Sequence, residues 1–73
     1  MTKTLSDKIE YLILLISEFA ARTKMTEAQA YQILRDSGAF ALCDKHYGIM
    51  HTLSVEDNIE TLLSYCRRKG VNV

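Results

Sequence analysis

The stretch that decides the fold runs from Leu5 to Phe19 and reads LSDKIEYLILLISEF. Its apolar side chains recur with the period of an α-helix, and most of them gather on one predicted core face. That face consists of Leu5, Ile9, Leu12, Ile13, Ile16 and Ala20, with Phe19 at its margin. Tyr11, Leu14 and Leu15 fall on the other side, so this helix is apolar almost all round. Such a helix needs cover on both sides, from the rest of a small bundle or from a second copy of the chain.

Start and stop signals for helices divide the chain around this stretch. Ser6 is a candidate N-cap for the first helix, which is expected to end near Thr23. Thr26 and Gln29 match a capping box that opens a second helix. Gly38 offers the left-handed residue that closes this second helix.

Two further patterns complete the predicted fold. The apolar spacing after Gly38 indicates a third helix that ends at Gly48, and the stretch from there to Leu53 is expected to be a loop. Ser54 then caps a last helix, which Gly70 stops. The sequence therefore predicts a single all-α domain over 1–73, a compact four-helix domain with helices at about 6–23, 27–36, 39–47 and 55–69.

Composition and charge narrow the class of protein. The 73 residues are 48% hydrophobic and 25% charged, which is typical of one small globular domain. Nine basic and nine acidic residues give a formal net charge of zero, which argues against nucleic acid as the main partner. No segment resembles a signal peptide, and the longest apolar run, from Tyr11 to Ile16, is far shorter than the roughly 18 residues of a membrane span. We therefore expect a soluble cytoplasmic protein.

Four side chains have types that suit zinc: Cys43, His46, His51 and Cys66. Cys43 and His46 stand one helical turn apart, but Cys66 is isolated, and strong zinc signatures pair their ligands at both ends. Both cysteines fall on apolar faces, where a free cysteine behaves as a small hydrophobic residue. We expect two buried thiols, no metal and no cofactor.

His51 permits two interpretations because it directly precedes the last helix, where backbone amides attract anions. It could bind a ligand or transfer a proton, or its ring nitrogens could bond backbone groups and lock the turn after Gly48. No glycine-rich phosphate loop, carboxylate pair or Ser-x-x-Lys motif is present. Cys43 on an apolar face would have a raised pKa and poor access. The sequence thus predicts no catalytic residue and no enzyme activity.

The second and third helices could imitate a helix-turn-helix around Gly38. The would-be recognition helix carries one lysine, Lys45, and no arginine, asparagine or glutamine to contact bases. The basic residues lie instead at helix ends, in two groups at Arg22 with Lys24 and at 67–69, where they complement helix dipoles. A small helix-turn-helix-like regulator that binds nucleic acid is kept as the alternative function.

The outer side of the first helix is the first candidate for an interaction surface. Tyr11, Leu14 and Leu15 recur at helical spacing, and Glu18 extends them by one turn. Either the other helices cover this strip, or a partner helix docks on it, most commonly from a second copy of the chain.

Three segments also form a recognisable set of motifs. They are Phe19-Ala20, Thr26-Glu-Ala-Gln-Ala30, and a Tyr-x-x-x-His-Thr-x-Ser element from Tyr47 to Ser54, followed by Ile59 and Tyr65. With these motifs, nearly the whole chain resembles a family of small bacterial proteins catalogued as a domain of unknown function. Members more often have Tyr-Asp where this chain has Tyr47-Gly48.

The resemblance implies an accessory role, since members are often encoded beside ADP-ribosyltransferase-like proteins. It implies an antitoxin-like function with a separately encoded partner. The leading prediction is a non-enzymatic, homodimeric protein-interaction module. Its candidate contact residues are Tyr11, Leu14, Leu15 and Glu18, and in the motif Tyr47, His51, Thr52 and Ser54.

Overall fold

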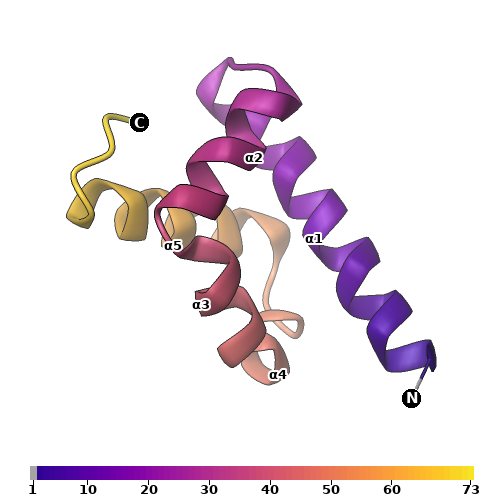
Figure 1. The fold of residues 1–73 in the computed structure, drawn as a ribbon. Helices are drawn as coiled ribbons and strands as arrows, with labels where there is room; N and C mark the ends of the chain where they lie inside the picture. Colours follow the sequence, from indigo (N-terminus) through magenta and orange to yellow (C-terminus); the bar gives the residue numbers. More distant parts are fainter. Residues whose placement is uncertain (1) are drawn as a thin grey trace.

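The computed structural model describes the backbone of residues 2–73 and the side chains of residues 7–73. Within that part of the chain all regular structure is helical, which confirms the all-α prediction (Figure 1). The helices are α1 (Thr2–Thr23), α2 (Glu27–Asp36), α3 (Ala39–Lys45), α4 (Tyr47–Met50) and α5 (Val55–Arg68). None of the helices in residues 2–73 has both the length and the hydropathy needed to cross a membrane.

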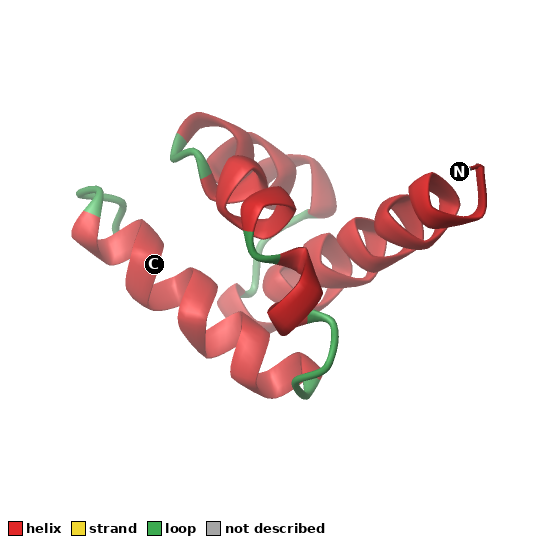
Figure 2. Cartoon of the chain, turned by 90° about the horizontal axis from the view of Figure 1, so that it is seen from below, coloured by secondary structure: helices red, strands yellow, loops and turns green. Residues whose placement is uncertain are grey.

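Helix α1 is the longest element among the described residues, and its N-terminal end extends beyond the other helices (Figure 1, Figure 2). The molecule is accordingly elongated, with extents of 36 × 21 × 21 Å. Leu15, Phe19 and Ala20 in the C-terminal half of α1 join the core, while Lys8 and Tyr11 in its N-terminal half contact Asp44 of α3 and Tyr47 of α4. Part of the apolar surface of α1 therefore lacks cover from the rest of the chain.

The core combines one side of α1 with the inner faces of the other four helices. Its buried members are Leu15, Phe19 and Ala20 from α1, Ala30 and Leu34 from α2, Ala39 and Cys43 from α3, Met50 from α4, and Ile59, Leu62, Leu63 and Cys66 from α5. Every helix thus contributes to a single cluster, as expected of one small domain.

The predicted core face of α1 is wrong at two of its central residues. Ile9 is 50% exposed and Ile13 is 60% exposed, whereas Leu15, which was placed on the outer side, is only 1% exposed. Phe19 is central to the core rather than marginal, with no exposed surface. The reason is that α1 is apolar on nearly every side, so its own periodicity does not determine which side the other helices cover.

The predicted signals at the ends of α2 and α5 are confirmed. Thr26 Oγ1 accepts from the Gln29 backbone N–H at 3.1 Å, and Gln29 Oε1 accepts from the Thr26 N–H at 3.0 Å, which completes the capping box. Ser54 Oγ accepts from the backbone N–H three residues further along, also at 3.1 Å. Gly38 and Gly70 adopt left-handed backbone conformations, with φ of 85° and 87°.

Two predicted helix boundaries are corrected. Helix α1 begins at Thr2, so Ser6 lies inside it rather than at its N-cap, because no glycine or proline interrupts this segment. The third helix ends at Lys45, because His46 leaves helical geometry with φ −109° and ψ 18°. Gly48 does not end a helix but lies within α4, which replaces the start of the predicted loop.

Candidate interaction surface

The strip predicted on the outer side of α1 does not form one exposed surface. Leu14 is 43% exposed and Glu18 is also exposed, but Leu15 lies in the core and Tyr11 is half-buried. Leu15 is therefore wrong as a contact residue, because the rest of the domain covers it. Within residues 7–23, where the side chains of α1 are described, the large apolar side chains that stay exposed are Ile9, Ile13 and Leu14.

Tyr11 is covered by Tyr47, which α4 places against the N-terminal half of α1. The two rings meet edge to face, with centroids 5.4 Å apart and an interplanar angle of 76°. The Tyr11 hydroxyl is buried and has no hydrogen-bond partner among the described residues. Burial, reinforced by the neighbouring Cys43 and Tyr47, raises the pKa of Tyr11 to about 12. At physiological pH Tyr11 is thus a neutral packing residue.

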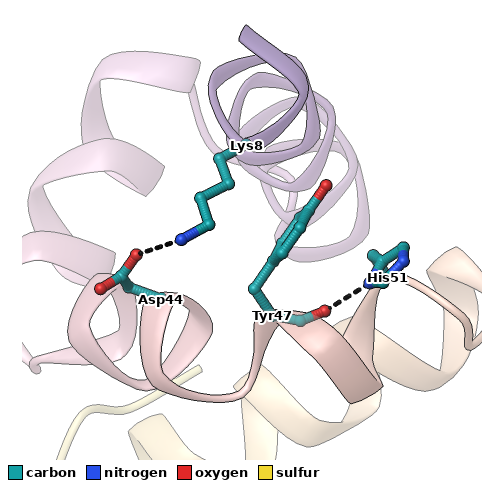
Figure 3. A network of polar contacts seen from close by, with 4 residues as sticks. All are labelled: Lys8, Asp44, Tyr47 and His51. Carbon is teal, nitrogen blue, oxygen red and sulfur yellow. Dashed lines mark hydrogen bonds and ion pairs between the residues drawn. The ribbon is translucent and has the colours of Figure 1, made fainter. Parts of the chain in front are cut away.

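A polar network joins α1, α3 and α4 beside this aromatic pair (Figure 3). Lys8 Nζ lies 3.3 Å from Asp44 Oδ1 on α3 and 5.4 Å from the centroid of the Tyr47 ring. The Tyr47 ring also stacks on the His51 imidazole, with centroids 4.6 Å apart. Because the Asp44 side chain is largely exposed, the ion pair stabilises the fold only slightly. Tyr47 is the residue through which α4 is anchored on α1.

The turn after α4 is held by side chains that bond its own backbone. His51 Nδ1 lies 2.6 Å from the Tyr47 carbonyl oxygen, and because a carbonyl only accepts, Nδ1 carries the proton. Thr52 Oγ1 donates to the Ile49 carbonyl oxygen at 2.6 Å, and Ser54 caps α5. Of the two interpretations of His51, this geometry supports the one in which its ring bonds a backbone group and holds the turn in place.

The same segment, from Tyr47 to Ser54, also carries exposed apolar side chains; we call it the α4 turn. Ile49 is 66% exposed and Leu53 is 46% exposed. Gly48 adjoins open space, since a Cβ built on it would meet nothing within 4 Å. The α4 turn is therefore a second surface on which apolar side chains remain without cover.

Asn58 is a structural residue that sequence reasoning missed. It is 1% exposed, and its Nδ2 donates to the Met50 carbonyl oxygen at 2.8 Å, so it joins α5 to the end of α4. Its Oδ1 is buried without a partner among the described residues. A signal was available in the spacing, because Asn58 follows Val55 by three residues and precedes Leu62 by four, within the apolar face of α5.

The cysteines are buried and free, as predicted. Burial, with a smaller contribution from Cys66, raises the pKa of the Cys43 thiol to about 11, so Cys43 stays protonated and is a poor nucleophile. His46 and His51 are exposed while both thiols are buried, so the four zinc candidates do not share one environment. Within residues 7–73, no three His, Cys, Asp or Glu side chains are grouped as metal ligands would be.

These features define a small all-α domain with a locked aromatic turn and two uncovered apolar surfaces. The chain belongs to the family described as Protein of unknown function (DUF3791), whose sequence model matches residues 10–69. No curated protein and no solved structure shows a significant match. The matched range contains Ile13 and Leu14, the exposed apolar residues of α1 after residue 10, and the whole α4 turn.

Proposed function

We propose that this protein is a non-enzymatic protein-interaction module that pairs with a second copy of itself through α1. The observation that carries this proposal is the exposure of Ile9 and Ile13, at 50% and 60%. They stand one helical turn apart on the same face of α1. Branched apolar side chains in such a position favour contact with another protein.

The chemistry of this face supports a second copy as the occupant. The side chains that follow Ile9 along the same arc are Ile13, half-buried Ile16 and Ser17, and none of them is charged. Two copies crossing antiparallel at Ile13 would place Ile9 of each opposite the small Ser17 of the other, which is the self-complementarity that a twofold interface requires. A net charge of zero removes long-range repulsion between copies.

The titratable groups of Cys43, Tyr11 and His51, all among the described side chains of residues 7–73, support the non-enzymatic part of the proposal. Cys43 and Tyr11 have raised pKa values and remain protonated, and His51 Nδ1 is bonded to the backbone. The two buried free thiols fit a reducing compartment, so we keep the cytoplasm as the proposed location. A separately encoded partner, as the antitoxin-like resemblance implies, would have the α4 turn available for contact.

The experiment that tests pairing is the oligomeric state of the full chain over a range of concentrations. We expect a dimer in sedimentation velocity at high micromolar concentration, and Ile13→Asp should weaken the association at least about tenfold. Ile49→Asp is the matched control, because it places the same charge on an equally exposed isoleucine outside α1. Circular dichroism checks that both variants stay folded.

Two results would contradict the proposal. One is a wild-type chain that remains a monomer at high micromolar concentration. The other is a dimer that dissociates in Ile49→Asp and persists in Ile13→Asp, which would place the interface on the α4 turn.

The nucleic-acid alternative receives less support. Helix α3 has seven residues, and its one basic side chain, Lys45, follows the exposed Asp44. A recognition helix normally presents several side chains that hydrogen-bond to base edges. A flat anisotropy titration with duplex DNA at low salt would remove this alternative.

A further inference from the structure

The ends of α1 and α5 bring together basic residues that are far apart in the sequence. Arg22 and Lys24 come from the end of α1, and Arg67 comes from the last turn of α5. All three line one surface hollow of about 430 Å³. The chain that follows α5 completes the hollow with Asn72, while Met25 and Leu63 supply apolar lining. The sequence alone indicated only two separate basic helix ends.

Two of these cations retain donors for a ligand. Arg22 forms an ion pair with Glu60, an acidic residue in the same hollow, and is neutralised by it. Arg67 Nε donates to the Val73 carbonyl oxygen at 2.9 Å, which orients the guanidinium and leaves its two terminal nitrogens. Lys24 takes part in none of the ion pairs formed within residues 7–73.

The backbone at Lys24 adds a second, independent observation. Lys24 has φ 58°, and the Met25 N–H bonds the Ala20 carbonyl oxygen at 3.0 Å, so Lys24 occupies the left-handed position of a helix C-cap. Gly38 and Gly70 fill the other left-handed positions among residues 2–73. A lysine in this conformation is strained where a glycine would not be. The residue in this left-handed conformation is one of the basic residues that line the hollow.

We propose that this hollow binds a phosphate dianion, held by the Lys24 ammonium and the terminal nitrogens of Arg67. Phosphate offers oxygens in several directions, so it can accept from both side chains at once, whereas a carboxylate has only two oxygens in one plane. The negative ends of the α1 and α5 dipoles lie nearby and oppose an anion. Binding is therefore expected to be millimolar and strongly reduced by salt. This inference does not depend on the pairing proposed for α1.

The test is a titration of the isotopically labelled full chain with inorganic phosphate, followed by backbone NMR shifts at about pH 8 and about 10 mM ionic strength. We expect saturable shifts around Lys24 and Asn72. Lys24→Ala and Arg67→Ala should each weaken binding about three- to tenfold. Arg68→Ala is the matched control, because the adjacent arginine does not line the hollow, and it should leave the affinity unchanged.

A second variant separates binding from folding. Lys24→Gly relieves the left-handed strain, so it should raise the thermal midpoint while it weakens phosphate binding as much as Lys24→Ala does. The proposal is overturned if wild-type shifts do not saturate or if Lys24→Gly keeps the wild-type affinity. Acetate that binds as tightly as phosphate at equal ionic strength would also overturn it.

Discussion

The side chain of His51 contacts Tyr47 in two ways: the two rings stack with planes 16° apart, and His51 Nδ1 donates to the Tyr47 carbonyl oxygen 2.6 Å away. The first contact orients the Tyr47 ring, which also meets the Tyr11 ring and the Lys8 ammonium of α1. The second reinforces the backbone bond that closes the helical turn of α4, in which the His51 N–H donates to the same carbonyl oxygen at 3.0 Å. Together they hold the α4 turn against the long helix, which explains a histidine at this place without any ligand.

His51→Ala should lower the free energy of unfolding by about 1 kcal/mol, since it removes one partly exposed hydrogen bond and one ring contact. Urea denaturation measures this loss. His46→Ala is the matched control, because His46 is an exposed histidine at the N-cap of α4 whose side chain makes no cap bond, and its effect should stay within about 0.5 kcal/mol. Equal losses of unfolding free energy in the two variants would contradict the role of His51 in holding the turn after α4.

Asn58→Ala should cost about 1–2 kcal/mol, because it removes the side-chain bond to the Met50 carbonyl oxygen, which then keeps only the Leu53 backbone N–H, and opens a small void. The measurement is again the urea midpoint. Ser64→Ala on the exposed side of α5 serves as the control and should be nearly neutral. A neutral Asn58→Ala would show that the bond to α4 does not hold the two helices together.

Leu15→Ala should destabilise the domain by about 2–5 kcal/mol, as expected for a leucine truncated in a packed core. Ile13→Ala should change stability by less than about 0.5 kcal/mol when measured at a concentration where the chain is monomeric. This pair tests the corrected face of α1 directly. If Ile13→Ala lost much stability and Leu15→Ala lost little, the core face of α1 would instead be the one predicted from the periodicity.

Stability should fall at alkaline pH because two buried groups hold their protons more tightly when the chain is folded. The pKa of Cys43 rises from 9.0 to about 11, and that of Tyr11 from 10.0 to about 12. The unfolded chain therefore loses these protons first, so the stabilisation is fully present below about pH 9 and is lost as pH rises through the folded pKa values.

Urea midpoints measured between neutral pH and about pH 11 check this dependence. Cys43→Ala removes one of the two groups, so this variant should lose less stability over the same range. Wild-type midpoints that stay constant up to about pH 11 would contradict the burial of the Cys43 proton.

The features predicted correctly from the sequence are local ones. The capping box of Thr26 and Gln29, the Ser54 cap and the left-handed Gly38 each depend on residues three or four positions apart. Helix α2 consequently has the bounds expected from the sequence, and α5 ends one residue earlier than expected. The burial of Cys43 also follows from its place in an amphipathic pattern.

By itself, the sequence determined the helical class of this protein and where α2 and α5 begin, because caps and amphipathic spacing act within one or two turns. Tertiary packing alone decided which side of α1 is covered, since an all-round apolar helix offers no preferred face and the choice falls to the helices that dock on it. The same packing buried Leu15, exposed Ile13, and brought Lys24 to the hollow lined by Arg67. These outcomes depend on residues distant in the chain, which no local pattern encodes.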